Sequence, residues 1–192
     1  MNVTIIGVPY DLDRPYTGMG KAPDALLDAG LGQRLAALGC QTVLAEIIDI
    51  PESNEPRETR LGHLLARIGY EVARSRAAGF FPLVVGGDCL VAVGVLAGLR
   101  DPANTGVAWV DAHGDFNTPE TTRSGFLDGM VLAVLAGRCW RAMAESIPDF
   151  RPLPEELVTL AGVRALDEDE ERELDGSEVR VVRASDVRAD GV

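Results

Sequence analysis

Two aspartates and a histidine follow a predicted strand at alternating positions. Residues 106–110 form an apolar run typical of a buried strand, and Asp111, His113 and Asp115 come directly after it. In extended backbone these side chains would point to the same side, so two carboxylates and an imidazole would converge beyond the strand's carboxyl end. This donor set suits a divalent transition metal better than calcium, which prefers oxygen alone. The alternative is that the aspartates cap loops and that His113 hydrogen-bonds locally.

Strands and helices alternate along the whole chain. Apolar runs predict strands at residues 2–7, 42–50, 81–85, 106–110, 157–161 and 179–182. Apolar residues at helical spacing predict helices at residues 23–38, 59–78, 90–99, 129–137, 140–146 and 167–174. This alternation predicts a parallel α/β sheet with helices on both faces, which makes three layers. Open parallel sheets bind ligands beyond their carboxyl edges, where the aspartates and the histidine are expected.

Three helical segments carry more specific expectations. The leucines between residues 26 and 38 recur at helical spacing and predict one core-facing helix that ends at Gly39. His63 lies about 200° round the next helix from Leu61, and this predicts a solvent-facing histidine. Asp167 and Glu170 form a capping-box pattern, so the acidic run at this position is interpreted as a solvated first helical turn and not as a metal site.

Composition and charge narrow the function classes. The 192 residues fit one domain, with 46% hydrophobic and 25% charged residues. The formal net charge of −12 disfavours binding to nucleic acid or an anionic membrane surface, and it would attract a cationic ligand. Three widely spaced cysteines indicate reduced thiols, and no signal peptide or membrane span is evident. These features predict a cytoplasmic protein.

Motifs across the chain resemble the ureohydrolase family, whose members include arginase and agmatinase. The resemblance is carried by Val84-Val-Gly-Gly-Asp88, Asp111-Ala-His-Gly-Asp-Phe-Asn-Thr-Pro119 and Thr121-Thr-Arg-Ser-Gly125, in that order. Ile5-Ile-Gly-Val-Pro9 and Val158-Thr-Leu-Ala-Gly-Val-Arg164 are similar to an early and a later strand of the family. The resemblance implies a three-layer αβα fold with a mainly parallel sheet, and a homo-oligomer.

The resemblance also implies a chemistry and a set of residues. Family members hydrolyse a C–N bond of a small cationic guanidino or amidino substrate such as arginine or agmatine, using two manganese ions. Asp111, His113 and Asp115 would be metal ligands, with Asp111 bridging. Asn117 and Ser124 fall where the family contacts the α-amino-acid end of its substrate. The alternatives are that Asn117 is a turn residue and that Ser124 caps a helix.

Two residues depart from the family pattern. Cys89 stands where the family has a histidine ligand after Gly86-Gly87-Asp88, and its soft thiolate would favour Zn²⁺ or Fe²⁺ over Mn²⁺. The alternative is that Cys89 is a small buried hydrophobe at the head of an apolar helix. Asp128 stands where the family has a proton-shuttling histidine, and it could act as an acid or base only if burial raised its pKa.

The family's second pair of carboxylates has no counterpart in the sequence. The family needs a late strand that ends in Asp-x-Asp, whereas this chain has only Asp11-Leu-Asp13 after the first strand and Asp167-Glu-Asp169 at a helix start. Residues 1–192 therefore resemble a single, C-terminally incomplete arginase-like domain that lacks the last strands. The leading hypothesis is a metal-dependent ureohydrolase-type enzyme whose activity as this chain alone is doubtful. The alternative is a non-catalytic relative that serves as a partner subunit or a ligand-binding protein.

Overall fold

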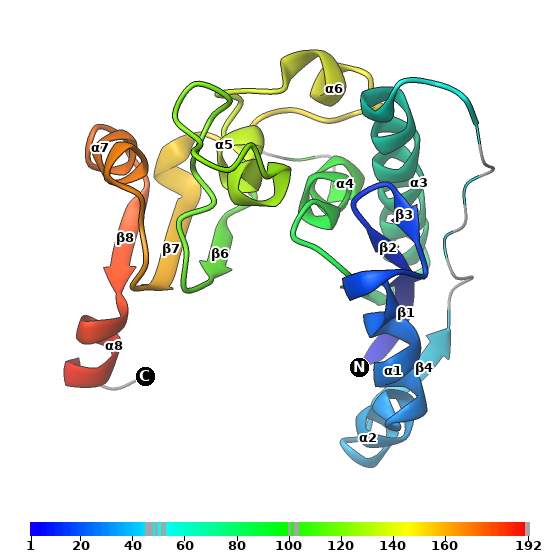
Figure 1. Cartoon of the computed structure of the whole chain (residues 1–192). Coiled ribbons are helices and arrows are strands. Elements are labelled where there is room, and N and C mark those ends of the chain that lie inside the picture. The colour runs from blue at the N-terminus through cyan, green and yellow to red at the C-terminus, as the bar shows by residue number, and fades with distance from the viewer. Residues whose placement is uncertain (45–47, 49, 51–52, 100, 102–103, 191–192) are drawn as a thin grey trace. The chain divides into compact units, whose positions relative to one another are not determined.

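The computed structural model describes residues 1–44, 48, 50, 53–99, 101 and 104–190 (Figure 1). The chain forms two compact units. Unit 1 comprises Met1–Arg100 and Ala142–Phe150, and unit 2 comprises Asp101–Arg141 and Arg151–Val192. Each unit has its own three-stranded sheet, and the single domain expected from the sequence stays a prediction.

The sheet of unit 1 has the strand order β4-β1-β5, formed by β4 (Gln41–Leu44), β1 (Asn2–Val8) and β5 (Phe81–Gly86). Both strand pairs are parallel, with Val3 beside Thr42 on one side and beside Phe81 on the other. Successive β1 residues such as Ile5 and Ile6 are both buried, so both faces of this strand are covered. Helices α1 (Ala22–Asp28) and α3 (Arg57–Ala77) each contact β1 and β5. The parallel α/β layering expected from the sequence is confirmed.

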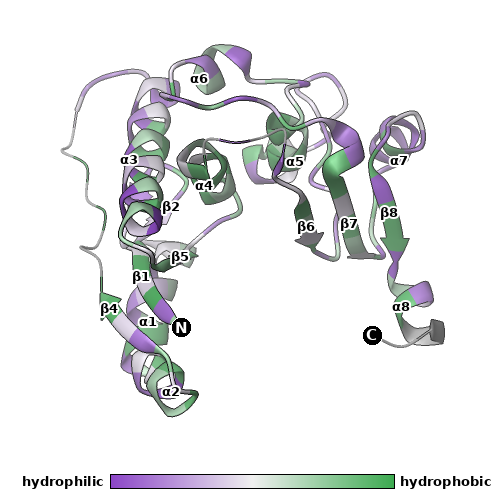
Figure 2. Ribbon diagram, turned by 180° about the vertical axis from the view of Figure 1, so that it is seen from behind, coloured by the Kyte–Doolittle hydropathy of each residue, from purple (hydrophilic) through white to green (hydrophobic). Residues whose placement is uncertain are grey.

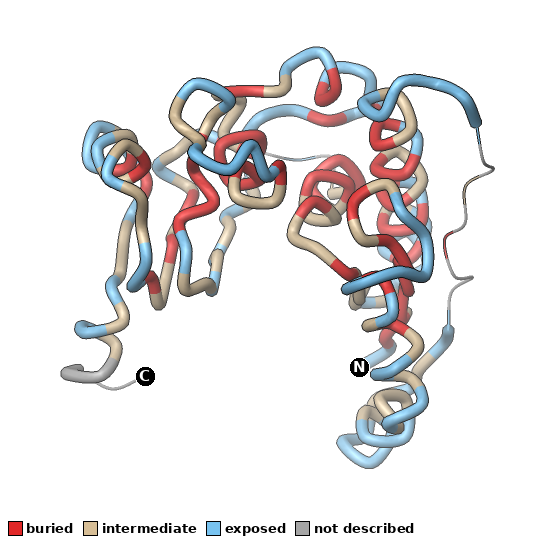
Figure 3. Tube along the Cα trace, in the orientation of Figure 1, coloured by how far each residue is buried: buried red, intermediate tan, exposed pale blue. Residues whose placement is uncertain are grey.

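Helix α3 packs closely against α4 (Val91–Leu99), and both have largely buried faces (Figure 3). Glycines allow this close approach. A Cβ atom on Gly94 would lie 2.7 Å from the Ile68 Cβ and from the Leu65 carbonyl oxygen, and one on Gly98 would lie 2.5 Å from the Gly69 carbonyl oxygen. The apolar character of α4 (Figure 2) therefore reflects a helix buried against a neighbour. No helix within the described ranges is long and apolar enough to cross a bilayer.

The single core-facing helix expected between residues 23 and 38 is wrong in two respects. The segment forms two helices, α1 and α2 (Leu31–Ala37), because Gly30 takes a left-handed conformation with φ 89° between them. No residue of α2 is buried, and Leu38, which follows it, is 81% exposed. Helical spacing of leucines was therefore not sufficient to predict burial. The loop before α1 contains a small antiparallel hairpin, β2 (Tyr10–Asp11) with β3 (Arg14–Pro15), and the 3₁₀ helix η1 (Gly18–Lys21).

The prediction for α3 is confirmed. The helix begins at Arg57, two residues before the expected start, and Leu61 is buried at its inner face. His63 is exposed, and its Nδ1 lies 3.4 Å from the Glu55 carboxylate. Part of the strand expected at 42–50 falls on residues 45–47 and 49, which lie outside the described residues.

The sheet of unit 2 has the order β6-β7-β8, formed by β6 (Val107–Val110), β7 (Val158–Val163) and β8 (Arg180–Arg183), again with parallel pairs. The helical elements of this part are η3 (Leu127–Met130), α5 (Val131–Leu135), η4 (Glu155–Leu157), α7 (Glu168–Asp175) and α8 (Ala184–Asp190). Helix α6 (Arg141–Glu145) begins the segment that returns to unit 1. The apolar helix expected at 129–137 forms as η3 followed by the short α5, and all five residues of α5 are buried.

Helix α7 forms the expected capping box between Asp167 and Glu170. Its first turn is not uniformly solvated, however, because Glu170 is only 4% exposed. Its carboxylate also accepts the Phe116 N–H over 2.9 Å and so contacts the loop after β6.

Candidate metal centre

The loop after β6 brings two of the predicted ligands together. A carboxylate oxygen of Asp111 lies within 4.8 Å of one of Asp115. The backbone between them is not extended as the alternation had suggested. It bends at Ala112–His113, where the Ala112 carbonyl accepts N–H groups from Arg164 and Ala165, and Asp115 has a φ of 49°. The two carboxylates thus approach each other through a bend rather than through strand alternation.

Asp115 is the most perturbed carboxyl group of this loop. It is 6% exposed, and the Trp109 Nε1–H donates to its Oδ2 over 3.0 Å. Burial raises the pKa of Asp115 to about 7, and the Trp109 hydrogen bond opposes this rise. The negative charges of Asp111, Asp128 and Glu170 add to the rise. The surroundings of Asp115 are therefore acidic.

This arrangement fits a divalent cation. Buried carboxylates that repel one another are unfavourable unless a proton or a cation compensates their charge. Oxygen donors from Asp111 and Asp115 are hard ligands of the kind that Mn²⁺, Mg²⁺ and Ca²⁺ accept, and a neighbouring imidazole would shift the preference towards Mn²⁺, Fe²⁺ or Zn²⁺. The donor set supports a metal at this loop, and the ligand roles stay predictions.

His113 lies beside Asp111. Its side chain is 67% exposed, and its Nδ1 is 3.2 Å from the Asp111 Oδ1, which also accepts the His113 backbone N–H over 2.9 Å. These are the local hydrogen bonds that the sequence left open as an alternative. They do not oppose ligation, because a metal-bound histidine commonly keeps one ring nitrogen on a carboxylate.

Cys89 belongs to unit 1, where it follows β5 and precedes α4. The glycines before it allow close packing: a Cβ on Gly87 would lie 2.1 Å from the Tyr10 carbonyl oxygen. Asp88 accepts the Leu12 N–H over 2.5 Å and so ties this corner to the loop after β1. Burial raises the pKa of Asp88. The thiol is half-buried, and its ligand role stays a prediction from the motif.

The two candidate substrate contacts are held by local hydrogen bonds. Asn117 is buried, its N–H donates to the Gly129 carbonyl, and its Oδ1 accepts the Thr121 hydroxyl over 3.0 Å. Ser124 is exposed, and its Oγ accepts the Phe126 N–H over 3.2 Å. The Asn117 contact agrees with the turn alternative. Ser124 does not cap a helix, because the N-cap of η3 is Phe126 and the Ser124 bond closes a local turn. The role of both residues towards a substrate is a proposal.

Asp128, the candidate acid or base, lies in η3. It is half-buried and close enough to Asp115 for its charge to raise the Asp115 pKa. The structure therefore places Asp111 and Asp128 close enough to Asp115 for their negative charges to raise its pKa.

Sequence reasoning missed two residues that hold this loop. Trp109 was counted only as part of an apolar strand, although its indole N–H donates to Asp115. Glu170 was interpreted as a solvated cap, yet its Oε1 accepts the Phe116 N–H over 2.9 Å. The capping-box pattern identified the position of Glu170 in its helix, but a pairing across 54 residues leaves no local signal.

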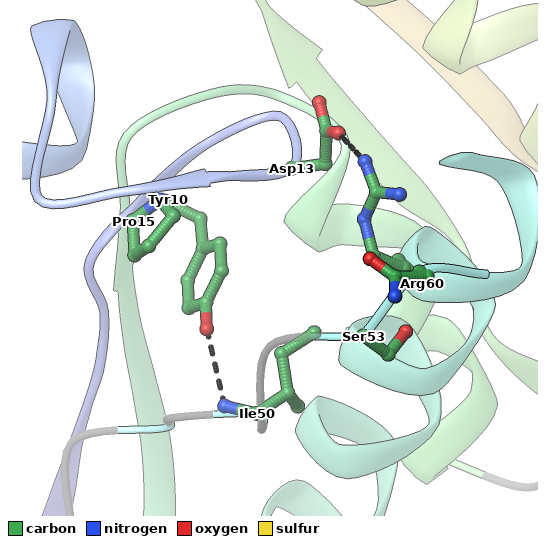
Figure 4. Close-up of a pocket in the computed structure, with 7 residues that line it drawn as sticks. Tyr10, Asp13, Pro15, Ile50, Ser53 and Arg60 are labelled. Carbon is green, nitrogen blue, oxygen red and sulfur yellow. Dashed lines mark hydrogen bonds and ion pairs between the residues drawn. The ribbon is translucent and has the colours of Figure 1, made fainter. Parts of the chain in front are cut away.

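A separate cavity of about 400 Å³ in unit 1 was also not predicted (Figure 4). It is lined by Tyr10, Asp13, Pro15, Ile50, Ser53, Asn54 and Arg60. Asp13 pairs with Arg60 and, over 3.1 Å, with Arg57, while Asp11 pairs with Arg14 over 2.9 Å. Burial works to raise the pKa of Asp13, but the two arginines outweigh it and hold that pKa below its usual value. The Asp11-Leu-Asp13 carboxylates are thus bound to guanidinium groups.

Comparison with known proteins identifies the family. The model of the arginase family matches residues 1–192. The chain belongs to the arginase family. It is 38% identical to the arginase of Bacillus caldovelox over 183 residues, which cover 88% of this chain and 60% of that protein. It is 34% identical to the arginase of Bacillus subtilis (strain 168) over 189 residues, covering 93% of this chain and 63% of the relative. The resemblance predicted from the motifs is confirmed.

Solved structures agree with the arginase fold. The crystal structure of the arginase from Bacillus cereus matches with a TM-score of 0.87 at 31% identity, covering 100% of this chain and 67% of that one. The agmatine ureohydrolase of Thermoplasma volcanium has the same fold, with a TM-score of 0.64 at 22% identity. The chain spans about 60% of the length of the Bacillus caldovelox arginase. In the described part of the chain, neither β7 nor β8 ends in Asp-x-Asp.

Proposed function

We propose that this arginase-family chain contributes the metal-binding loop of a hydrolase that cleaves a C–N bond in linear amidines or guanidines. The observation that carries the proposal is the Asp111–Asp115 pair, two carboxylates within 4.8 Å of each other at a strand end, one of them buried with a pKa near 7. Membership of the arginase family supports the reaction class. The substrate would be a small guanidino or amidino cation such as arginine or agmatine.

Each residue of the loop has a proposed role. Asp111, Asp115 and His113 would hold a divalent cation, which supplies Lewis-acid stabilisation of charge and acidifies water for attack on the guanidino carbon. Two further residues hold the loop in place. Glu170 accepts the Phe116 N–H, and the Trp109 indole donates to the Asp115 carboxylate. A cationic substrate suits the acidic surroundings of this loop and the net charge of −12.

Proton transfer is assigned to Asp128. A carboxyl group can act as a general acid or base when its pKa approaches the working pH. Asp128 lies in η3, half-buried and near the Asp115 carboxylate. Asn117 and Ser124, on either side of the turn at residues 118–122, would orient the far end of the substrate. The homo-oligomer expected for the family and a cytoplasmic location stay predictions.

Metal loading tests the proposal directly. The chain is loaded with Mn²⁺, Zn²⁺ or Fe²⁺ and analysed for bound metal, beside the variants His113→Ala and Asp115→Asn. We expect at least one equivalent in the parent chain and a loss of about one equivalent in each variant, because both side chains are proposed ligands. His63→Ala is the matched control, since His63 is an exposed histidine of unit 1 that pairs with Glu55. Retention of metal by both loop variants would refute the proposed site.

The second candidate is a non-catalytic relative that acts as a partner subunit or ligand-binding protein. It is favoured by the lack of a strand ending in Asp-x-Asp in the described part of the chain, which leaves a second cation without its carboxylates. Reading the gene past the codon for Val192 separates the two. An in-frame strand that ends in Asp-x-Asp would favour the enzyme, and a stop codon would favour the non-catalytic relative.

A further inference from the structure

Each of the three residues Asp115–Asn117 has a backbone group in a hydrogen bond to another segment of the chain. The Asp115 carbonyl accepts N–H groups from Leu132 over 2.8 Å and Ala133 over 3.3 Å, at the start of α5. The Phe116 N–H donates to Glu170, and the Asn117 N–H donates to the Gly129 carbonyl. A non-glycine residue at positive φ, such as Asp115 at 49°, costs on the order of 1–2 kcal/mol and persists only when its surroundings hold it. The loop conformation is therefore imposed by its neighbours.

The side chain of Phe116 is held as firmly as its backbone. Its ring is completely buried, and the guanidinium carbon of Arg138 lies 4.6 Å from the ring centroid. Such a cation over a buried ring is favourable and directional. Phe116 is the residue between Asp115 and Asn117, so a shift of its ring would move both neighbours.

Two carboxylates fix the guanidinium above the ring. The Arg138 Nε donates to the Glu155 Oε1 over 2.6 Å, and its Nη1 donates to the Glu173 Oε2 over 2.8 Å. Glu155 lies in η4 and Glu173 in α7, so Arg138 connects these elements to the loop. The hydrogen bond that Arg138 donates to Glu155 and the nearby negative charges raise the pKa of Arg138. A planar guanidinium suits this contact because it stacks on the ring and binds two carboxylates at once.

We propose that Arg138 is a positioning residue for the metal centre: stacked on Phe116 and anchored by Glu155 and Glu173, it sets the direction in which Asp115 presents its carboxylate to the cation. The two glutamates pair with its positive charge, so Arg138 affects Asp115 through its contact with the Phe116 ring. Arg138 also follows α5, whose first N–H groups hold the Asp115 carbonyl. The inference rests on the proposed function, because it needs a cation at Asp115.

Cobalt binding measures this role without an activity assay. Co²⁺ is titrated into the full chain and followed by its d–d absorption, which reports ligand geometry, while far-UV circular dichroism monitors folding. Arg138→Lys keeps the positive charge and loses the planar stack, and Phe116→Leu removes the ring. We expect each to alter the d–d band and to weaken Co²⁺ binding, by no more than the roughly 10- to 100-fold that loss of a direct outer partner of a ligand typically causes, because Phe116 and Arg138 act one step further from the ligand.

A double variant and a matched control distinguish positioning from general damage. The double variant carries both Arg138→Lys and Phe116→Leu. Because Arg138 acts through Phe116, it should bind Co²⁺ no more weakly than the single variant with the lower Co²⁺ affinity. Arg172→Lys is the control: Arg172 also pairs with two carboxylates, Glu168 and Asp169, but it is 65% exposed on the outside of α7. Its Co²⁺ affinity should match that of the parent chain.

Each outcome decides between the two proposals. If the parent chain binds Co²⁺ and a folded Arg138→Lys variant binds it with the same affinity and spectrum, the positioning role is wrong and the metal site stands. If the parent chain does not bind Co²⁺, the proposed function fails and this inference fails with it. If Arg138→Lys does not fold, Glu173→Gln releases one side of the guanidinium at a half-exposed carboxylate, and unchanged affinity there overturns the inference.

Discussion

At the scale of single residues, Asp115 combines three unusual properties. It has a left-handed backbone, it is almost fully buried, and its pKa is raised to about 7 by burial and by neighbouring carboxylates. The sequence indicated that Asp115 would meet Asp111, but for the wrong geometric reason, since the backbone between them bends. Nothing in the local sequence shows that this carboxylate would be buried, or that a carboxylate as distant in the chain as Glu170 would help to raise its pKa.

The raised pKa of Asp115 predicts how the stability of the metal-free chain depends on pH. The folded pKa is about 7, above the ordinary value of 3.8, so the folded state holds this proton more tightly than the unfolded state. The corresponding stability is fully present below about pH 4 and is lost as the pH rises through about 7. Urea denaturation of the parent chain and of Asp115→Asn at pH 5 and pH 8 measures it. We expect the parent chain to lose more stability across this range than the variant.

The control for this experiment is Asp169→Asn, in an exposed carboxyl group on α7 that pairs with Arg172. It should show the same pH dependence as the parent chain. Equal pH dependence in all three proteins would contradict the raised pKa of Asp115.

A second prediction for a single residue concerns Cys89, and it rests on the position of this cysteine after Gly86-Gly87-Asp88. A thiolate is a soft ligand and an imidazole is a harder one, so Cys89→His should shift the metal preference from Zn²⁺ towards Mn²⁺. Competition between the two metals, measured by elemental analysis, tests this. An unchanged ratio would indicate that Cys89 is a small packing residue, as its half-buried position at the head of α4 allows.

At the scale of elements, the contact between α3 and α4 depends on glycine. A Cβ on Gly94 would come within 2.7 Å of the Ile68 Cβ and of a backbone oxygen of α3, so the helices would have to separate. Alanine ordinarily stabilises a helix interior relative to glycine, by about 1 kcal/mol. Here the steric conflict opposes that gain.

Two glycine variants compare these effects. Gly94→Ala should lower the free energy of unfolding by about 1–3 kcal/mol, the usual range for overpacking a core. Gly32→Ala, in the exposed helix α2, should raise it by about 0.4–1 kcal/mol, because nothing lies within 4 Å of the added methyl group. Chemical denaturation measures both. A stabilised Gly94→Ala would mean that the α3–α4 contact has room to adjust.

The elements also show how far the sequence could predict the fold. Five of the six expected strands and the long helix α3 follow from apolar patterns of the right period and were predicted to within a few residues. The strand expected at 42–50 is described as β4 only to Leu44, and the β2–β3 hairpin was not predicted. The division at Gly30 was missed because the leucine spacing continues on both sides of it. Whether leucines such as Leu38 meet a partner depends on elements distant in the chain, which a periodic pattern does not describe. The burial of Glu170 was missed for the same reason.

At the scale of the whole molecule, the chain has the fold of an arginase over about two thirds of the length of the matching structures. Its candidate ligands are Asp111, His113, Asp115 and Cys89. Hydrolysis by two cations needs carboxylates that clamp both of them, and the described strands supply only one such group.

We therefore predict that the 192-residue chain alone does not release urea from arginine or agmatine at an enzymatic rate. A missing second cation, and the absence of the histidine that the family resemblance places at Asp128, would both act on the chemical step, and general acid–base catalysis alone contributes typically about 10²–10⁴-fold. A urea-release assay with Mn²⁺, Zn²⁺ and Fe²⁺ supplied in turn measures it, with the arginase of Bacillus subtilis as the positive control. Robust, metal-dependent turnover would show that the four candidate ligands suffice.

The interleaving of the two units along the chain bears on synthesis at the ribosome. Residues 142–150 complete unit 1, and Met143, Ile147 and Phe150 are buried there. The sheet β4-β1-β5 can form once residue 86 has emerged, but the core of unit 1 closes only after residue 150. By then β6 and its acidic loop have also emerged, while β7 and β8 have not yet left the ribosome. The candidate metal loop therefore emerges before β7 and before Glu170 of α7, which accepts its Phe116 N–H.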